Sequence, residues 1–403
     1  MINRKQLVQI ALFFMLLHPL YVYVLNTFKI YQLPLTIVSI IILIVALIMG
    51  LKIKKKAIMM CMPWMLLFTY MILNNKGEAE NFVFYFSMII IMLVLSMVPD
   101  WQESAIKIIA IMTFPHVFFT VLLFFIPTLY SSIRPFISAD NIMFEGYKTA
   151  LTGHYSTNAI YISISLIVFG AILFHYGLKN TNKKYMICFV LSIFAILLTT
   201  KRGPLIFSVV AIFITYILVD KNRISSRFVK ILMVLMIFGV IFYLLSKYIP
   251  SISETFVRFS EDGDSGRSVM YLLAINMFLE NPILGKGTGA YKLQYHIYLA
   301  QDVQHMYLNA HNVYLQLLAE NGILGLVLFV YAAFYTLLKS ISLLRKFHKE
   351  GTKNEKTMYT SVAFQIYFLL YCLTGNPLYD SMMYIPYFIF CAVSYSMYIR
   401  EKL

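Results

Sequence analysis

His311 and Asn312 are the pair of residues in the sequence whose types and position most clearly suggest a catalytic role. The residues from Val313 to Glu320 have a helical pattern, and asparagine is a preferred N-cap. We therefore expect a helix that follows Asn312 and stops at Asn321-Gly322 before span ten. A helix N-terminus disfavours an imidazolium ion and thus helps keep a preceding histidine neutral at about pH 7. A neutral imidazole can take a proton from a hydroxyl group as a general base. Capping alone would explain Asn312 but gives no reason for the histidine before it.

Three arginines, Arg202, Arg258 and Arg267, stand near helix starts or within a long polar loop. The guanidinium group keeps its charge and can contact two phosphate oxygens at once. Three such groups near a lipid surface would suit a diphosphate head group. The alternatives are that Arg202 only reaches toward the membrane interface and that Arg258 lies on an ordinary solvated surface.

A glycine-rich turn, residues 285–291, contains Gly285, Gly287, Gly289 and Tyr291. Glycine permits close approach of the backbone to a ligand, so we assign these four residues to substrate binding. The turn is not a nucleotide-binding fingerprint, because no strand, turn and helix surround it. The Asp-Gly-Asp segment at 262–264 matches a metal-binding pattern but also an ordinary turn, which we favour. We therefore predict no metal and no cofactor.

The composition indicates the kind of fold that must position these residues. Hydrophobic residues make up 60% of the 403-residue chain and charged residues only 13%, against about 25% charged residues in a soluble domain. The missing charge leaves long apolar runs, and a run of about 20 apolar residues spans a bilayer as a helix. Several such runs exclude a water-soluble fold. We predict an all-α polytopic membrane protein.

Twelve membrane spans fit the sequence. They are residues 6–26, 33–50, 57–73, 82–98, 107–128, 159–176, 185–200, 204–219, 230–247, 322–341, 357–374 and 382–398. If both termini are cytoplasmic, most Lys and Arg residues fall in cytoplasmic segments, as the positive-inside rule requires. We therefore expect a multi-pass membrane protein with both termini in the cytoplasm.

Two of the predicted external loops are long. Residues 129–158 form the first, in which we assign Arg134 and His154 to substrate binding, and residues 248–321 form the second, which lies between spans nine and ten. The second loop contains an apolar, helix-like stretch from Ser268 to Glu280, so we expect it to be folded and to carry the catalytic groups. The predicted divisions are thus 1–247, 248–321 and 322–403.

Several classes of function are disfavoured by what the spans hold. None of the twelve contains Asp or Glu, whereas ion-coupled transporters commonly place such carboxylates in the membrane. His18, His116 and His175 lie alone on apolar faces, where we expect hydrogen-bonded packing roles. The net charge of +15 is ordinary for a membrane protein with basic cytoplasmic loops, so we predict no nucleic-acid partner.

The motifs together resemble the bacterial O-antigen ligases and the related O-antigen and capsular polysaccharide polymerases. The resemblance rests on the His311-Asn312 pair, followed after nine residues by Gly322 and Gly325 of a Gly-x-x-Gly step. It also rests on three shorter steps, which are Ser265-Gly266-Arg267, the glycine-rich turn ending at Tyr291, and Arg202-Gly203.

The resemblance implies a metal-independent, inverting glycosyltransferase that uses an undecaprenyl-diphosphate-linked glycan as donor and a second glycan as acceptor. His311 would activate the acceptor hydroxyl group, while Arg202 and Arg267 would neutralise the departing diphosphate, with Asn312 and Arg258 as further binding residues. Membrane lipids are implied partners, and a flippase and a chain-length regulator are further candidates. One departure concerns loop 129–158, because the polymerases are described with arginine-rich external loops and this one offers only Arg134.

Polymerisation of repeat units into O-antigen or capsule is the function we favour from the sequence. A ligase that transfers finished glycan to lipid A–core or another acceptor would use the same motifs. A lipid-linked oligosaccharide flippase would need a polar cavity within the spans, whereas the polar groups here gather outside them. A membrane sensor or scaffold would leave His311 and Arg267 replaceable.

Overall fold

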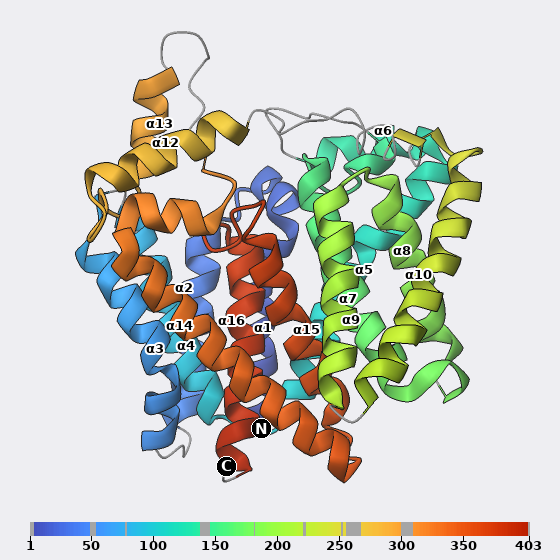
Figure 1. Cartoon of the computed structure of the whole chain (residues 1–403), viewed down its shortest axis with the longest axis horizontal. Helices are drawn as coiled ribbons and strands as arrows, with labels where there is room; N and C mark the ends of the chain where they lie inside the picture. The colour runs from blue at the N-terminus through green and yellow to red at the C-terminus, as the bar shows by residue number, and fades with distance from the viewer. Residues whose placement is uncertain are drawn as a thin grey trace. The chain divides into compact units, whose positions relative to one another are not determined.

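The computed structural model describes residues 4–48, 54–76, 79–137, 146–180, 182–220, 223–250, 253–254, 267–299 and 309–401. Over these ranges the chain is helical, without a β-strand, which confirms the all-α prediction (Figure 1). The α-helices are α1 Arg4–Thr27, α2 Gln32–Ile48, α3 Lys55–Leu73, α4 Ala79–Met97, α5 Gln102–Phe125, α6 Tyr130–Ile133, α7 Tyr155–Asn180, α8 Lys183–Leu198, α9 Arg202–Val219, α10 Ile224–Ser246, α12 Arg267–Glu280, α13 Ala290–Leu299, α14 Val313–Glu350, α15 Glu355–Tyr371 and α16 Ser381–Arg400. Three short 3₁₀ helices cover Pro127–Leu129, Arg134–Phe136 and Gly146–Lys148.

Seven helices within the described ranges are long and apolar enough to cross a membrane. They cover Lys5–Thr27, Lys55–Leu73, Gln102–Phe125, Tyr155–His175, Arg202–Val219, Val313–Glu350 and Ser381–Arg400. The chain is therefore a multi-pass membrane protein. The other five predicted spans fall on α2, α4, α8, α10 and α15, and a full count of twelve crossings stays a prediction.

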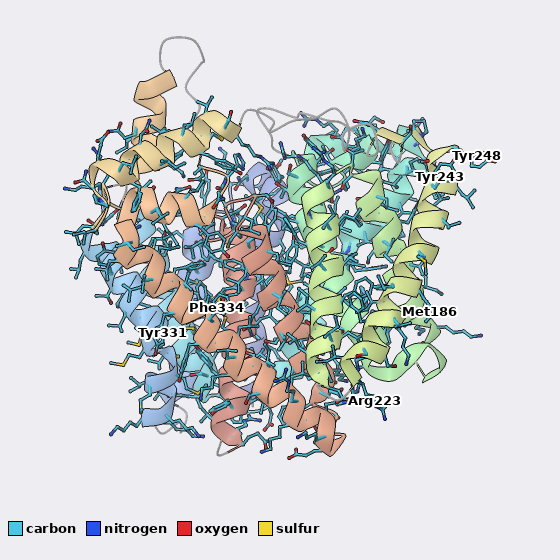
Figure 2. All side chains as sticks on the ribbon, in the orientation of Figure 1. Met186, Arg223, Tyr243, Tyr248, Tyr331 and Phe334 are labelled. Carbon is cyan, nitrogen blue, oxygen red and sulfur yellow. The ribbon has the colours of Figure 1, made fainter. Side chains whose placement is uncertain are left out.

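The outer face of α14 carries exposed apolar side chains that suit contact with lipid. Val327, Tyr331, Phe334 and Leu338, spaced by four, three and four residues, are each 51–62% exposed. Figure 2 labels Tyr331 and Phe334 on this helix. A soluble protein would bury such an apolar stripe, whereas in a bilayer the stripe contacts lipid.

The chain divides into two compact units. Unit 1 comprises Met1–Ile42, Pro99–Asp262 and Ile341–Tyr367, and unit 2 comprises Leu43–Val98, Gly263–Ser340 and Phe368–Leu403. Each unit is thus assembled from segments far apart in the sequence. The predicted external catalytic loop, 248–321, contributes residues to both units.

In unit 1, α7 packs against α5, α8 and α9, and small hydroxyl side chains join the helices. The Thr113 and Ser165 hydroxyl groups lie 2.9 Å apart. His116 Nε2 lies 3.0 Å from the Leu20 carbonyl oxygen, and its ring contacts Tyr21 and Tyr161. This contact confirms the packing role predicted for His116. Interhelical hydrogen bonds of this kind hold membrane helices together where the hydrophobic effect between them is weak.

In unit 2, Trp64 of α3 forms the centre of the core. Its indole Nε1–H donates to Thr336 Oγ1 of α14 at 2.9 Å, and the Tyr395 hydroxyl of α16 lies 2.6 Å from the same oxygen. The rings of Tyr387 and Phe388 pack edge-on against the indole. One threonine hydroxyl therefore connects three helices, because it accepts from two neighbours while donating to the carbonyl of Ala332.

Replacing Thr336 by valine should separate this polar connection from packing. Thr336→Val keeps the shape but leaves the buried Trp64 N–H and Tyr395 O–H without their shared acceptor. We expect a loss of about 1–2 kcal/mol of stability, measured as a lower midpoint of thermal unfolding in detergent. Thr336→Ser keeps the hydroxyl group and is the control. Equal midpoints for the valine and serine variants would show that the connection contributes nothing.

Candidate active site

The site begins with a bend in α14. Gly322 has φ 61° and ψ −166°, so the helical path breaks there and continues in a new direction (Figure 1). A Cβ atom on Gly322 would lie 2.2 Å from the carbonyl oxygen of Ile283. Glycine is required on two counts, since its φ is left-handed and a neighbouring backbone occupies the space of a side chain. The predicted helix end at Asn321-Gly322 is confirmed as this bend.

The glycine-rich turn docks directly on the bend. Lys286 N–H donates to the Ala319 carbonyl at 2.9 Å, and Gly287 N–H donates to the Glu320 carbonyl at 2.7 Å. A Cβ atom on Gly285 would lie 2.3 Å from the Glu320 carbonyl carbon, and one on Gly287 would lie 2.1 Å from Lys76 Cγ. The close approach that these two glycines permit is therefore an approach to other protein segments.

The end of α3 completes the support of this turn. Asn74 Nδ2 donates to the carbonyl oxygens of Leu284 at 2.9 Å and Glu320 at 3.2 Å. Thr288 N–H donates to the Asn74 carbonyl at 2.7 Å, and Lys76 N–H donates back to the Thr288 carbonyl at 2.9 Å. Asn74 thus holds the turn and the bend in register. Sequence reasoning missed it, because its partners lie more than 200 positions away.

Glu320, which the sequence analysis did not single out, is fully buried. Its carboxyl group lies between the glycine-rich turn and α14. Its Oε1 accepts from the Tyr291 N–H at 3.3 Å and from Gln316 Nε2 at 3.2 Å. Gln316 Oε1 in turn accepts from the Ala310 N–H at 3.0 Å. Three hydrogen bonds, through Glu320 and Gln316, therefore connect the glycine-rich turn to the residue before His311. A buried carboxylate without such partners would be strongly destabilising.

His311 is held in a defined place at the start of α14. Its φ is +52°, an uncommon conformation for a residue other than glycine. Asn312 Oδ1 accepts from the Leu315 N–H at 3.1 Å, which confirms the predicted N-cap. Val313 N–H donates to the Cys372 carbonyl at 2.9 Å. The helix start is thus joined to the segment between α15 and α16, residues 372–380.

Charged groups of α12, α13 and the 372–380 segment interact electrostatically in the same unit. Arg267, the first residue of α12, and Asp380 both act on the Tyr371 hydroxyl group. Burial raises the pKa of Asp380 to about 6, while the Met382 N–H and the charge of Lys292 on α13 act in the opposite direction. Arg267, the glycine-rich turn, His311 and Asn312 therefore belong to one unit, and both Arg267 and the start of α14 interact with the chain at the end of α15.

The remaining predicted residues lie elsewhere. Arg134, His154 and Arg202 belong to unit 1, and Arg258 lies outside the described residues. Arg134 Nη1 donates to the Ile137 carbonyl at 2.9 Å. Tyr291 is fully buried, and its hydroxyl group donates to the Met270 carbonyl at 2.9 Å, which favours packing over the predicted substrate contact.

His154 and Arg202 of unit 1 belong to a second polar group at the start of α9. Thr200, just before Lys201 and Arg202, has φ +60°, a strained value for a β-branched residue. The Lys201 ammonium group lies 3.9 Å from the centroid of the Tyr155 ring. Burial and the nearby Lys201 charge lower the pKa of His154 to about 4. His154 is therefore neutral at about pH 7, and two cations stand together at one helix start.

Comparison with known proteins bears on the middle of the chain. Residues 187–330 match the family model described as O-antigen ligase. This range contains Arg202, Arg267, the glycine-rich turn and His311. Arg134 and His154 lie before it. No curated protein matches the chain.

The close packing of the bend can be tested with two glycines of nearly equal φ. Gly322 has φ 61° and Gly351 has φ 63°, but a Cβ atom on Gly351 would meet nothing within 4 Å. Both alanine variants are strained by a positive φ. Gly322→Ala is strained further, because its ψ of −166° lies in a region that is essentially restricted to glycine, and it alone also forces two backbones apart. We expect Gly322→Ala to lower thermal stability in detergent clearly more than Gly351→Ala. Equal losses would contradict a docked turn.

Proposed function

We propose that the chain, whose residues 187–330 match the O-antigen ligase family model, polymerises lipid-linked oligosaccharide repeat units into a surface polysaccharide, O-antigen or capsule. The family relation makes the chain a glycosyltransferase-type enzyme. Undecaprenyl diphosphate as the donor lipid, the bacterial cell membrane as the location and cytoplasmic termini are parts of the proposal. A flippase that delivers the donor and a chain-length regulator are proposed partners.

The proposal is supported chiefly by the way in which neighbouring segments hold His311 in place. The residue precedes a capped helix start that is tied to the 372–380 segment, and Arg267 begins a helix in the same unit. A histidine fixed by several segments can keep one ring nitrogen aimed at a substrate. An arginine that cannot lose its charge complements a departing anion.

Glycosyl transfer would proceed in one displacement. The acceptor hydroxyl oxygen attacks the anomeric carbon as His311 takes the hydroxyl proton. The bond from the anomeric carbon to the phosphate oxygen breaks, and the diphosphate leaves with the electron pair. Attack opposite the leaving group inverts the anomeric configuration. Arg267 neutralises the charge that develops on the diphosphate, and such a positioned charge needs no metal to act.

Transfer of finished glycan to a lipid acceptor is the second candidate. It is favoured by the description of the matching family, O-antigen ligase. The two activities share the same donor chemistry and differ in the acceptor. A deletion strain distinguishes them, because a polymerase defect leaves chains of one repeat unit and a ligase defect leaves long unattached chains.

His311→Ala should abolish elongation. Loss of a general base typically costs about 10²–10⁴-fold in rate, so the polysaccharide ladder of a complemented deletion strain should collapse to the pattern of the empty strain. Membrane extracts should contain the variant at the wild-type level. A wild-type ladder from His311→Ala would refute the assignment of a general base.

Arg267→Lys should be poorly tolerated although it keeps the positive charge. An ammonium group cannot form the paired contact that a guanidinium group makes with two phosphate oxygens. We expect a loss of more than about tenfold in elongation rate, since each hydrogen bond to a charged group contributes about 1.5–3 kcal/mol. Arg223→Lys, at an arginine whose side chain is 77% exposed and pairs with Asp220 of unit 1, is the control. Full activity of Arg267→Lys would reduce the residue to a surface charge.

A further inference from the structure

The 372–380 segment between α15 and α16 brings an amide against the ring of His311. Asn376 Nδ2 lies 3.3 Å from His311 Nδ1. Asn376 follows the last apolar residues of α15, outside residues 187–330, and no motif in the sequence marks it. The contact joins residues 65 positions apart.

Three further hydrogen bonds hold the two partners in place. Val313 N–H donates to the Cys372 carbonyl at 2.9 Å, and the Tyr314 hydroxyl group donates to the Leu369 carbonyl at 2.9 Å. Tyr379 N–H donates to the Asn376 carbonyl at 2.9 Å, which closes a turn around the amide. The Asn376 side chain therefore meets the His311 ring because both backbones are fixed to each other.

The two ends of the amide would give His311 opposite roles. When Asn376 Nδ2 faces Nδ1, the neutral ring carries its proton on Nε2, which then donates hydrogen bonds. When the amide oxygen faces Nδ1, the ring carries its proton on Nδ1, and Nε2 can accept one. A half-turn about the Cβ–Cγ bond exchanges the two ends. Asn376 Oδ1 is buried and without a partner among the described residues, so this rotation would give it one.

We propose that Asn376 is the positioning residue of His311, and that its amide oxygen accepts from Nδ1–H so that Nε2 takes the proton of the acceptor hydroxyl group. The proposal rests on the function proposed above, in which His311 is the general base. The proton leaves the acceptor oxygen as that oxygen bonds to the anomeric carbon. The resulting imidazolium keeps its second proton on Nδ1, where the Asn376 oxygen stabilises it.

Other titratable groups stand on the elements around this pair. Tyr379 and Asp380 belong to the same segment as Asn376, Glu320 lies on α14, and Arg267 and Lys292 lie on α12 and α13. Asp380 interacts with Lys292, and Glu320 interacts with Tyr379. A test based on pH must therefore compare variants of Asn376 in which all five of these groups remain unchanged.

The test uses purified full-length protein in liposomes with a lipid-diphosphate-linked repeat unit as substrate, and measures kcat and KM from pH 5 to 9. Asn376→Leu removes both ends of the amide, and we expect kcat to fall by about 10²-fold with little change in KM. Asn376→Asp presents only acceptor oxygens and a negative charge. It should therefore retain activity at high pH, with the acidic limb of the pH profile moved up by about 1 unit or more. Asn182→Asp, the same chemical change at the N-cap of α8, is the control.

Wild-type kcat in Asn376→Leu would overturn the proposal, as would an Asn376→Asp protein that is folded but inactive at every pH. The second result would assign His311 Nε2 as a donor. If Asn376→Leu does not insert into the membrane, the pH profile of Asn376→Asp decides alone. If the proposed glycosyl transfer is wrong, the result differs from both of these, because the wild-type protein itself would form no glycosidic bond in the same liposomes.

Discussion

The glycine-rich turn and the bend of α14 in unit 2 are held together by the contact between two backbones at Gly322 and Gly285. Neither position has room for a Cβ atom, because each would meet the other segment's backbone at 2.2–2.3 Å. This approach lets the glycine-rich turn donate hydrogen bonds to the carbonyl groups at the bend. The carbonyls are available there because the bend interrupts the helical hydrogen bonds that would otherwise take them. The start of α14, and with it His311, therefore points away from the line of the following span.

Polar groups are used in two ways in the molecule. Within the spans, hydroxyl groups such as that of Thr336 join helices that have no hydrophobic reason to associate in lipid. Beyond the spans, buried groups such as Glu320 and Asn74 join loops to one another. The second set joins the end of α3, the glycine-rich turn and the bend of α14, and it reaches Ala310, next to His311, through Gln316. Catalysis by a positioned base needs this rigidity, because a loose imidazole loses its orientation toward the substrate.

Local patterns in the sequence predicted a large part of this arrangement. The apolar runs, the helix of Arg267–Glu280, the N-cap at Asn312 and the break at Gly322 each depend on neighbouring residues. The roles of Asn376 and Asn74 could not be predicted, because their partners are far away in the sequence and an isolated asparagine carries no periodic signal. Helix α13 was missed for a related reason, since its ten tyrosine-rich residues are stabilised by packing against α12. For the same reason, burial of Tyr291 could not be distinguished from substrate contact.

We propose that the chain cleaves a diphosphate-linked donor and does not carry it across the membrane. This can be measured as the amount of lipid diphosphate released per glycosidic bond formed, with purified protein in liposomes and a labelled lipid-linked repeat unit. We expect one lipid diphosphate to be released for each bond, in step with growth of the polymer. Movement of intact donor between the two leaflets, without release of lipid diphosphate, would contradict it.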